Sequence, residues 1–93
     1  MMSVYKALAD PTRRKILQLL RDGNLSAGDI SEQFNFAKPT ISRHLSVLKE
    51  ADLIQGTKRG TTIMYRLNVT VLEEALMAML ESFKINLGDT SNE

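Results

Sequence analysis

One segment concentrates side chains that can donate hydrogen bonds on what reads as a single helix face. These donors are Lys38, Thr40, Ser42, Arg43 and Ser46. The apolar positions Ile41, Leu45 and Leu48 follow helical spacing and would turn inward, which leaves the donors outside. Arginine offers a two-pronged donor that fits guanine, and short hydroxyls allow close approach to bases or phosphates. We therefore predict that a helix in this segment lies in a DNA major groove, with the contacts made by Lys38, Pro39, Thr40, Ser42 and Arg43.

A second pair of cations, Lys58 and Arg59, lies between two short strand patterns at 53–57 and 62–67. The segment 58–61 would form the tip of a hairpin, with Gly60 at the position that needs a positive φ. A long cation on a narrow hairpin can enter a minor groove or bind its phosphates. The alternative is an edge charge that discourages aggregation. We predict the DNA role for both cations.

The elements that would position the first group of donors form a helix-turn-helix over residues 25–53. Ser26, followed by Asp29 three residues later, has the form of a capping box and would begin the first helix. Asn35 lies where the chain must turn, and Asn accepts a left-handed backbone at low cost. A second helix would then run to about Ala51.

Further helices are predicted on either side of this motif. Asp10-Pro11 is a helix start signal, Gly23-Asn24 a stop signal, and Thr70 with Glu73 a second capping box. The predicted helices outside the motif cover residues 3–8, 12–21 and 70 to 83 or 85. The predicted fold is mainly α with a small β-hairpin wing (α+β), a winged helix-turn-helix of four helices, two strands and a final helix. It would be a single domain over 1–87, followed by a disordered tail at 88–93.

Composition excludes several classes of function. The chain has no cysteine, which rules out disulfides, thiolate chemistry and Cys-ligated zinc. Its net charge of +1 hides an uneven distribution, because residues 36–66 carry six basic and two acidic side chains, whereas 67–93 carry one and five. The positive segment coincides with the predicted DNA face. We find no paired carboxylates, nucleophile–base pair or phosphate-cradling loop, and predict neither an enzyme nor a cofactor.

Two further features have open roles. Arg13, Arg14 and Lys15 are contiguous and cannot share one helix face, so we expect one to reach a phosphate and the others to lie on the surface. His44 lies between the inward Ile41 and the outward Arg43. It either packs and orients its neighbours or contacts DNA, and we favour packing.

Three motifs occur in order along the chain: DPTRRKIL at 10–17, AGDISEQF at 27–34 and KPTISRHLSVLKEADLI at 38–54. Together they resemble the ArsR-type family of bacterial repressors over residues 4–83, and within it most of all the SdpR-type autorepressors. The resemblance implies a homodimeric winged-helix repressor, built around its first and last helices and released from DNA by a signal.

The chain departs from the family at the metal sites. Metal-sensing members usually carry a Cys pair where this chain has Ser26 and Gly28, and neither is a soft-metal ligand. Other members bind zinc through Asp and His on the last helix, which here contains no His. We therefore expect no metal site and no metal sensing.

The final helix carries a long apolar stripe, more than a chain of this size can bury by itself. We predict that it forms a homodimer interface with the first helix, and that two-fold symmetry selects an inverted-repeat operator. The predicted interface residues are Val4, Tyr5, Leu8, Leu72, Leu76, Met79, Leu80 and Phe83.

These observations favour a DNA-binding transcriptional repressor in a bacterial-type cytoplasm, acting on its own or a neighbouring promoter. The alternative is a winged-helix interaction module whose basic face binds an acidic protein. A protein partner, membrane-borne or soluble, or a small molecule at the dimer interface would release the repressor. We expect no insertion into lipid, because no apolar run approaches the length of a membrane span.

Overall fold

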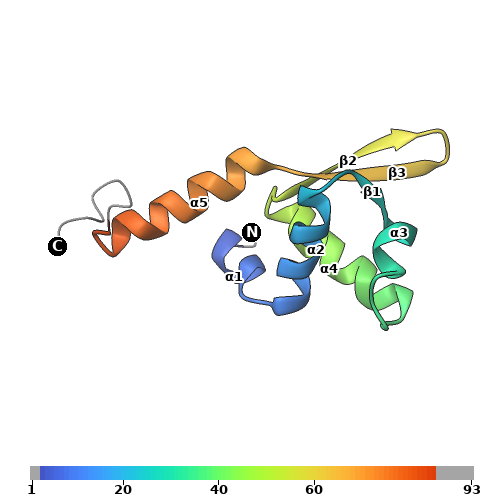
Figure 1. Ribbon diagram of the computed structural model, residues 1–93, viewed down its shortest axis with the longest axis horizontal. Coiled ribbons are helices and arrows are strands. Elements are labelled where there is room, and N and C mark those ends of the chain that lie inside the picture. The colour runs from blue at the N-terminus through green and yellow to red at the C-terminus, as the bar shows by residue number, and fades with distance from the viewer. Residues whose placement is uncertain (1–2, 86–93) are drawn as a thin grey trace.

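The computed structural model describes residues 3–85, in which five helices accompany a small antiparallel sheet (Figure 1). The elements in chain order are α1 (Val4–Leu8), α2 (Pro11–Arg21), β1 (Leu25–Ser26), α3 (Ala27–Ser31), α4 (Lys38–Glu50), β2 (Ile54–Arg59), β3 (Thr62–Leu67) and α5 (Val69–Ser82). The predicted class, mainly α with a hairpin wing, is confirmed. The predicted tail at 88–93 lies outside the described residues.

Local capping chemistry sets where most helices begin. The Asp10 carboxylate accepts hydrogen bonds from the backbone N–H groups of Thr12 (2.8 Å) and Arg13 (3.1 Å), and Pro11 occupies the first turn of α2. The capping box of α3 is confirmed, with Ser26 Oγ accepting from Asp29 N and Asp29 Oδ2 from Ser26 N. Hydrogen bonding from the backbone and side chain of Ser26 lowers the pKa of the Asp29 carboxyl, because it stabilises the charged form.

The connection between α3 and α4 differs from the predicted short turn. α3 ends at Ser31, and residues 32–37 then lead to α4. Asn35 is not among the described residues with a positive φ, so its predicted left-handed backbone is wrong. Six residues spread the change of direction over several peptide units, and no single residue has to adopt a costly conformation. Phe34 and Phe36 stack within this connection, with their ring centroids 5.7 Å apart.

The hairpin is longer than predicted, and a third strand joins it. β2 continues through Lys58 and Arg59, which leaves Gly60 and Thr61 as a two-residue loop. The positive φ predicted for Gly60 is confirmed at +64°. The sheet order is β1-β3-β2, with β1 pairing to the edge of β3 that β2 leaves free.

The last helix begins earlier than its predicted capping box. Asn68 is the N-cap, and its side chain accepts from the backbone N–H of Val71 at 3.4 Å. The predicted Thr70–Glu73 box is therefore wrong. The backbone N–H of Asn68 donates to the Leu53 carbonyl at 2.9 Å, which fixes this residue at the base of the hairpin and makes it the cap.

One core unites the helices and the base of the sheet. Its fully buried large side chains are Ile16, Ile30, Ile41, Leu48, Leu53 and Ile54. At one end of the molecule α5 extends away from this core, and at the other the hairpin projects (Figure 1), which gives principal dimensions of 51 × 25 × 22 Å. No helix within residues 3–85 combines the length and hydropathy that a membrane span requires.

Candidate nucleic-acid interface

The outer face of α4 carries the hydrogen-bond donors that were predicted from the sequence to lie there. Ile41, Leu45 and Leu48 are buried against the other helices, as predicted. Lys38, Pro39, Ser42, Arg43 and Ser46 are exposed, while Thr40 is half-buried. The packing of one side of α4 thus fixes a polar, cationic surface on the other.

The first turn of α4 adds a partial positive charge to this surface. Ala37 is its N-cap and provides no side-chain hydrogen bond, and the first turn contains no acidic residue. The aligned peptide dipoles therefore leave a positive end that neither an acceptor nor a carboxylate offsets, next to the Lys38 ammonium. Such a helix start attracts phosphate groups.

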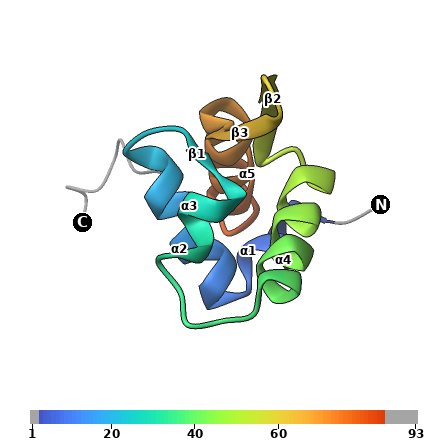
Figure 2. The same ribbon diagram turned by 90° about the vertical axis from the view of Figure 1, so that its right-hand side faces the viewer.

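The hairpin carries its two cations on opposite faces. Lys58 and Arg59 are consecutive residues of β2 and pair with Ile63 and Thr62, respectively. Because neighbouring side chains in a strand alternate, Lys58 shares the face of the buried Ile54, and Arg59 the other. In Figure 2, α4 runs up the side of the molecule towards the hairpin above it. The two cationic elements thus lie on one side of the protein, although only one wing cation can point towards a given groove.

The cations of this surface are free of carboxylate partners within residues 3–85. The salt bridge found there joins Arg21 to Asp22, at 3.1 Å between two exposed side chains. None of Lys38, Arg43, Lys58 and Arg59 forms an ion pair with a described residue. Their charge is therefore available to a polyanion.

Two of the three neighbouring cations of α2 donate hydrogen bonds to α1. Arg13 is half-buried, and its Nε donates to the Ala7 carbonyl at 2.7 Å, while Arg14 donates to the Leu8 carbonyl at 2.8 Å. Arg14 and Lys15 are exposed, as expected for surface cations, whereas Arg13 is held against α1. His44 is half-buried with Nδ1 3.4 Å from Arg13 Nη1, in line with the packing role we favoured.

A second surface is formed by α5, which extends away from the hairpin, and by α1, which lies below it at the body of the molecule (Figure 1). Val71 and Leu72 pack against the core, and Ala75 is buried, but beyond Ala75 the helix leaves the body of the protein. The large apolar side chains exposed on this surface are Tyr5, Val69, Leu76, Met77, Met79, Phe83 and Ile85.

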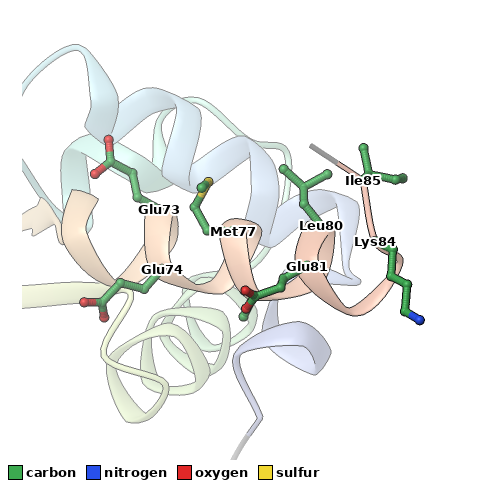
Figure 3. Close-up of a pocket in the computed structure, with 8 residues that line it drawn as sticks. Glu73, Glu74, Met77, Leu80, Glu81, Lys84 and Ile85 are labelled. Carbon is green, nitrogen blue, oxygen red and sulfur yellow. The ribbon is translucent and has the colours of Figure 1, made fainter. Parts of the chain in front are cut away.

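An open groove of about 860 Å³ runs along this part of α5. Its lining residues are Glu73, Glu74, Met77, Ala78, Leu80, Glu81, Lys84 and Ile85. In Figure 3, Met77 and Leu80 point to the same side of the helix as Glu73, whereas Glu74 and Glu81 point to the other. The exposed apolar surface is thus bordered by carboxylates.

The positions that matter for metal binding carry other functions. Ser26 uses its hydroxyl to cap α3, and Gly28 has no side chain to offer. Within residues 3–85, no three His, Cys, Asp or Glu side chains gather into a group that could hold a metal ion.

Comparison with known proteins identifies this arrangement. The model of the bacterial regulatory protein, arsR family, matches residues 10–55. The transcriptional repressor SdpR of Bacillus subtilis (strain 168) is 52% identical over 89 residues, which cover 96% of this chain and 97% of that protein. The chain belongs to the ArsR family. It is a DNA-binding transcriptional repressor and not an enzyme, and the predicted SdpR-type resemblance is confirmed.

Other ArsR-family relatives support the same assignment. The arsenical resistance operon repressor of Staphylococcus xylosus is 41% identical over 71 residues, or 76% of this chain and 68% of that protein. Among solved structures, a possible transcriptional regulator for arsenical resistance superposes with a TM-score of 0.76 at 37% identity, covering 87% of this chain and 83% of that one. An ArsR-like regulator from Rhodococcus sp. RHA1 gives 0.75 at 30% identity, covering 86% and 74%.

Sequence reasoning missed three features that shape this ArsR-family surface. They are the β1 strand, the aromatic stack before α4, and the contacts of Arg13 with α1 and α4. A signal existed only for the last, because an arginine beside a helix N-cap can fold back on the preceding chain.

Proposed function

We propose that this repressor binds an inverted-repeat operator as a homodimer, with α4 in the major groove and the hairpin on the flanking DNA. The observation that carries the proposal is the unpaired cationic face of α4, which includes Lys38 at its N-terminus and the exposed Arg43. The proposed contacts are Lys38, Pro39, Thr40, Ser42 and Arg43 on α4, with Lys58 and Arg59 on the hairpin. Bound across a promoter, the protein would exclude polymerase.

The exposed apolar surface of α1 and α5 supports the homodimer. Leu76 is 47% exposed and Phe83 70% exposed, although both lie in the apolar stripe of α5. Several large apolar side chains exposed on one helix are typical of an interaction surface. A second copy related by a two-fold axis would cover the patch and place two α4 helices in successive major grooves, about 34–36 Å apart. The proposed interface is Val4, Tyr5, Leu8, Leu72, Leu76, Met79, Leu80 and Phe83.

The assignment of the DNA face is tested by comparing two arginine variants on a footprinted operator. We expect Arg43→Ala to weaken binding by about tenfold and to relax sequence preference, because a bidentate arginine discriminates between bases by about 1–3 kcal/mol. Arg59→Ala should weaken binding to all sequences more evenly and reduce the salt dependence by about one charge. Fluorescence anisotropy at two salt concentrations measures both effects.

Arg21→Ala is the matched control, because Arg21 is paired with Asp22 away from the proposed face. It should leave operator affinity unchanged. The assignment is wrong if Arg43→Ala and Arg59→Ala bind as tightly as the parent protein. Binding to an acidic protein in place of DNA would favour the interaction-module alternative.

We also propose that release from DNA does not depend on a metal. The chain has no cysteine, and Ser26 is committed to capping α3. Adding zinc or arsenite should therefore leave operator affinity unchanged. A protein partner or a small molecule at the dimer interface is the release signal we expect. The relation to SdpR-type autorepressors suggests action at the protein's own promoter, and thus a cytoplasmic location with the DNA.

A further inference from the structure

Arg13 occupies a junction between three helices. Its Nε donates to the Ala7 carbonyl at 2.7 Å and its Nη2 to the Lys6 carbonyl at 3.0 Å, both in the last turn of α1. Its third nitrogen, Nη1, lies 3.4 Å from Nδ1 of His44 on α4. Its own backbone N–H donates to the Asp10 carboxylate. One side chain on α2 therefore touches both α1 and α4.

The contacts with α1 explain how so short a helix keeps its place. α1 has five residues, so few of its carbonyls find a backbone donor in a following turn, although the Lys6 carbonyl accepts from Ala9 N at 3.2 Å. Arg13 bonds two of them with a planar, rigid group, and Arg14 takes the Leu8 carbonyl at 2.8 Å. Within residues 3–85 Arg14 makes no hydrogen bond to α4, so of the two arginines only Arg13 contacts both α1 and α4.

The contact with α4 falls beside the proposed DNA-reading face. His44 lies between Arg43, which is exposed, and Leu45, which is buried. The guanidinium of Arg13 can only donate, so a hydrogen bond between the two side chains uses Nδ1 of His44 as its acceptor. This contact would add to the core packing of α4 in restraining the rotation of the helix about its axis, and with it the direction of Arg43.

We propose that Arg13 is a positioning residue for operator recognition, which transmits the placement of α1 in the dimer to the orientation of α4 on DNA. The inference rests on the proposed function, since it needs α1 in the dimer interface and α4 in the groove. Arg13 itself would not touch DNA. Its loss should therefore lower affinity for the operator while leaving affinity for unrelated DNA and the number of phosphate contacts as they are.

The test compares Arg13→Gln with Arg14→Gln, which removes one bond to α1 but no contact with α4. Affinities for the operator and for an unrelated duplex are measured by fluorescence anisotropy at several salt concentrations. The protein is kept fully dimeric and, by circular dichroism, fully folded. We expect Arg13→Gln to lose about tenfold in operator affinity, with an unchanged salt slope, and Arg14→Gln to stay within about twofold.

His44→Ala removes the same contact from the other side and should cost operator affinity about as much. The double variant should then lose little more than the worse of the two single variants, because both changes break one link. If Arg13→Gln does not fold, Arg13→Lys, which keeps the charge but loses the planar fork, takes its place in the comparison.

Three outcomes would overturn the inference. In the first, Arg13→Gln binds the operator as well as Arg14→Gln does. In the second, Arg13→Gln also weakens binding to unrelated DNA and lowers the salt slope, which makes Arg13 a phosphate ligand. In the third, the effects of Arg13→Gln and His44→Ala simply add. Failure of the proposed function looks different, because Arg43→Ala would then bind the operator normally or the parent protein would be monomeric.

Discussion

Asp52 ends α4 with a backbone conformation that normally favours glycine. Its φ is +62°, and the surrounding hydrogen bonds run from Leu53 N to the Leu48 carbonyl and from Asp52 N to the Lys49 carbonyl, each at 3.0 Å. This pair of bonds is the Schellman arrangement, in which the left-handed residue lets the last carbonyls of a helix find donors. A residue with a Cβ pays about 1–2 kcal/mol to adopt it.

Replacing Asp52 with glycine should therefore stabilise the protein. We expect Asp52→Gly to raise the free energy of unfolding by about 0.5–1 kcal/mol, because relief of the left-handed strain exceeds the added freedom of the unfolded chain. Urea denaturation measures the change. Asp22→Gly, at the end of α2 with an ordinary φ of −88°, is the control and should give no gain. Equal effects of the two substitutions would contradict this account.

The carboxyl group of Asp10 makes the folding stability depend on pH in the acid range. Burial raises the pKa of its carboxyl, but the hydrogen bonds from Arg13 and Thr12 and the charges of His44 and Arg13 outweigh that effect, so the pKa lies below the ordinary 3.8. A carboxylate whose pKa is lower in the folded state stabilises the protein above the unfolded value and stops doing so as the pH falls through the folded one.

The parent protein should consequently lose stability below about pH 4 more steeply than Asp10→Asn, which keeps a neutral cap. Thermal melting as a function of pH measures the difference. Parallel melting curves for the two proteins between neutral and strongly acid pH would contradict the assigned role of Asp10.

Among the elements, the wing depends on a glycine whose importance the sequence did not reveal. Gly56 lies opposite Tyr65 in the hairpin, and a Cβ built on it would approach Ile63 Cγ2 to 2.8 Å. Because Gly56 has no side chain, the side chains of Ile63 and Tyr65 on β3 can lie against β2 at this position. Ile63 is branched at Cβ and has few other rotamers to adopt.

Gly56→Ala should accordingly destabilise the fold by about 1–3 kcal/mol, since the added methyl forces the hairpin to shift. It should also weaken DNA binding at temperatures where the protein remains folded, because Lys58 and Arg59 move with β2. Chemical denaturation and fluorescence anisotropy check the two effects. Gly28→Ala is the control, because a Cβ there would meet only Ser26 Oγ, at an ordinary 3.7 Å. A Gly56→Ala protein as stable as the control would contradict this interpretation.

The elements predicted from the sequence are those with strong local signals. The Asp10-Pro11 start, the Ser26–Asp29 capping box and the inward spacing of Ile41 and Leu45 depend on neighbours within a few residues. β1 could not be predicted in this way, because its two residues become a strand only by pairing with Tyr65 and Met64, far along the chain.

The start of α5 likewise depends on a contact between residues that are distant in the sequence. Asn68 and Thr70 both have side chains that can cap a helix, and local chemistry favoured the box formed by Thr70 and Glu73. The long-range bond between Asn68 N and the Leu53 carbonyl decides for Asn68. For the same reason, the contact between Arg13 and His44, which are 31 residues apart, emerges only once α1, α2 and α4 have packed.

For the molecule as a whole, the proposed homodimer predicts that thermal stability depends on protein concentration. If two copies cover this surface, the melting temperature should rise with protein concentration, because association stabilises only the folded state. Leu76→Glu should abolish that rise and yield a monomer in analytical ultracentrifugation, since a carboxylate would have to be buried unpaired.

Glu74→Lys changes charge on the same helix outside the predicted interface and should leave the protein dimeric. A parent protein that sediments as a monomer, with a melting temperature independent of concentration, would contradict the homodimer.

The most direct test of the central claim is footprinting on DNA fragments selected by the purified protein without added metal. A dimer with one α4 helix and one wing per half-site should protect an inverted repeat whose half-sites lie one helical turn apart. Removing one half-site should abolish specific binding, and Arg43→Ala should remove the protection at both. Protection of a single asymmetric site, or selection of no common sequence at all, would contradict the account.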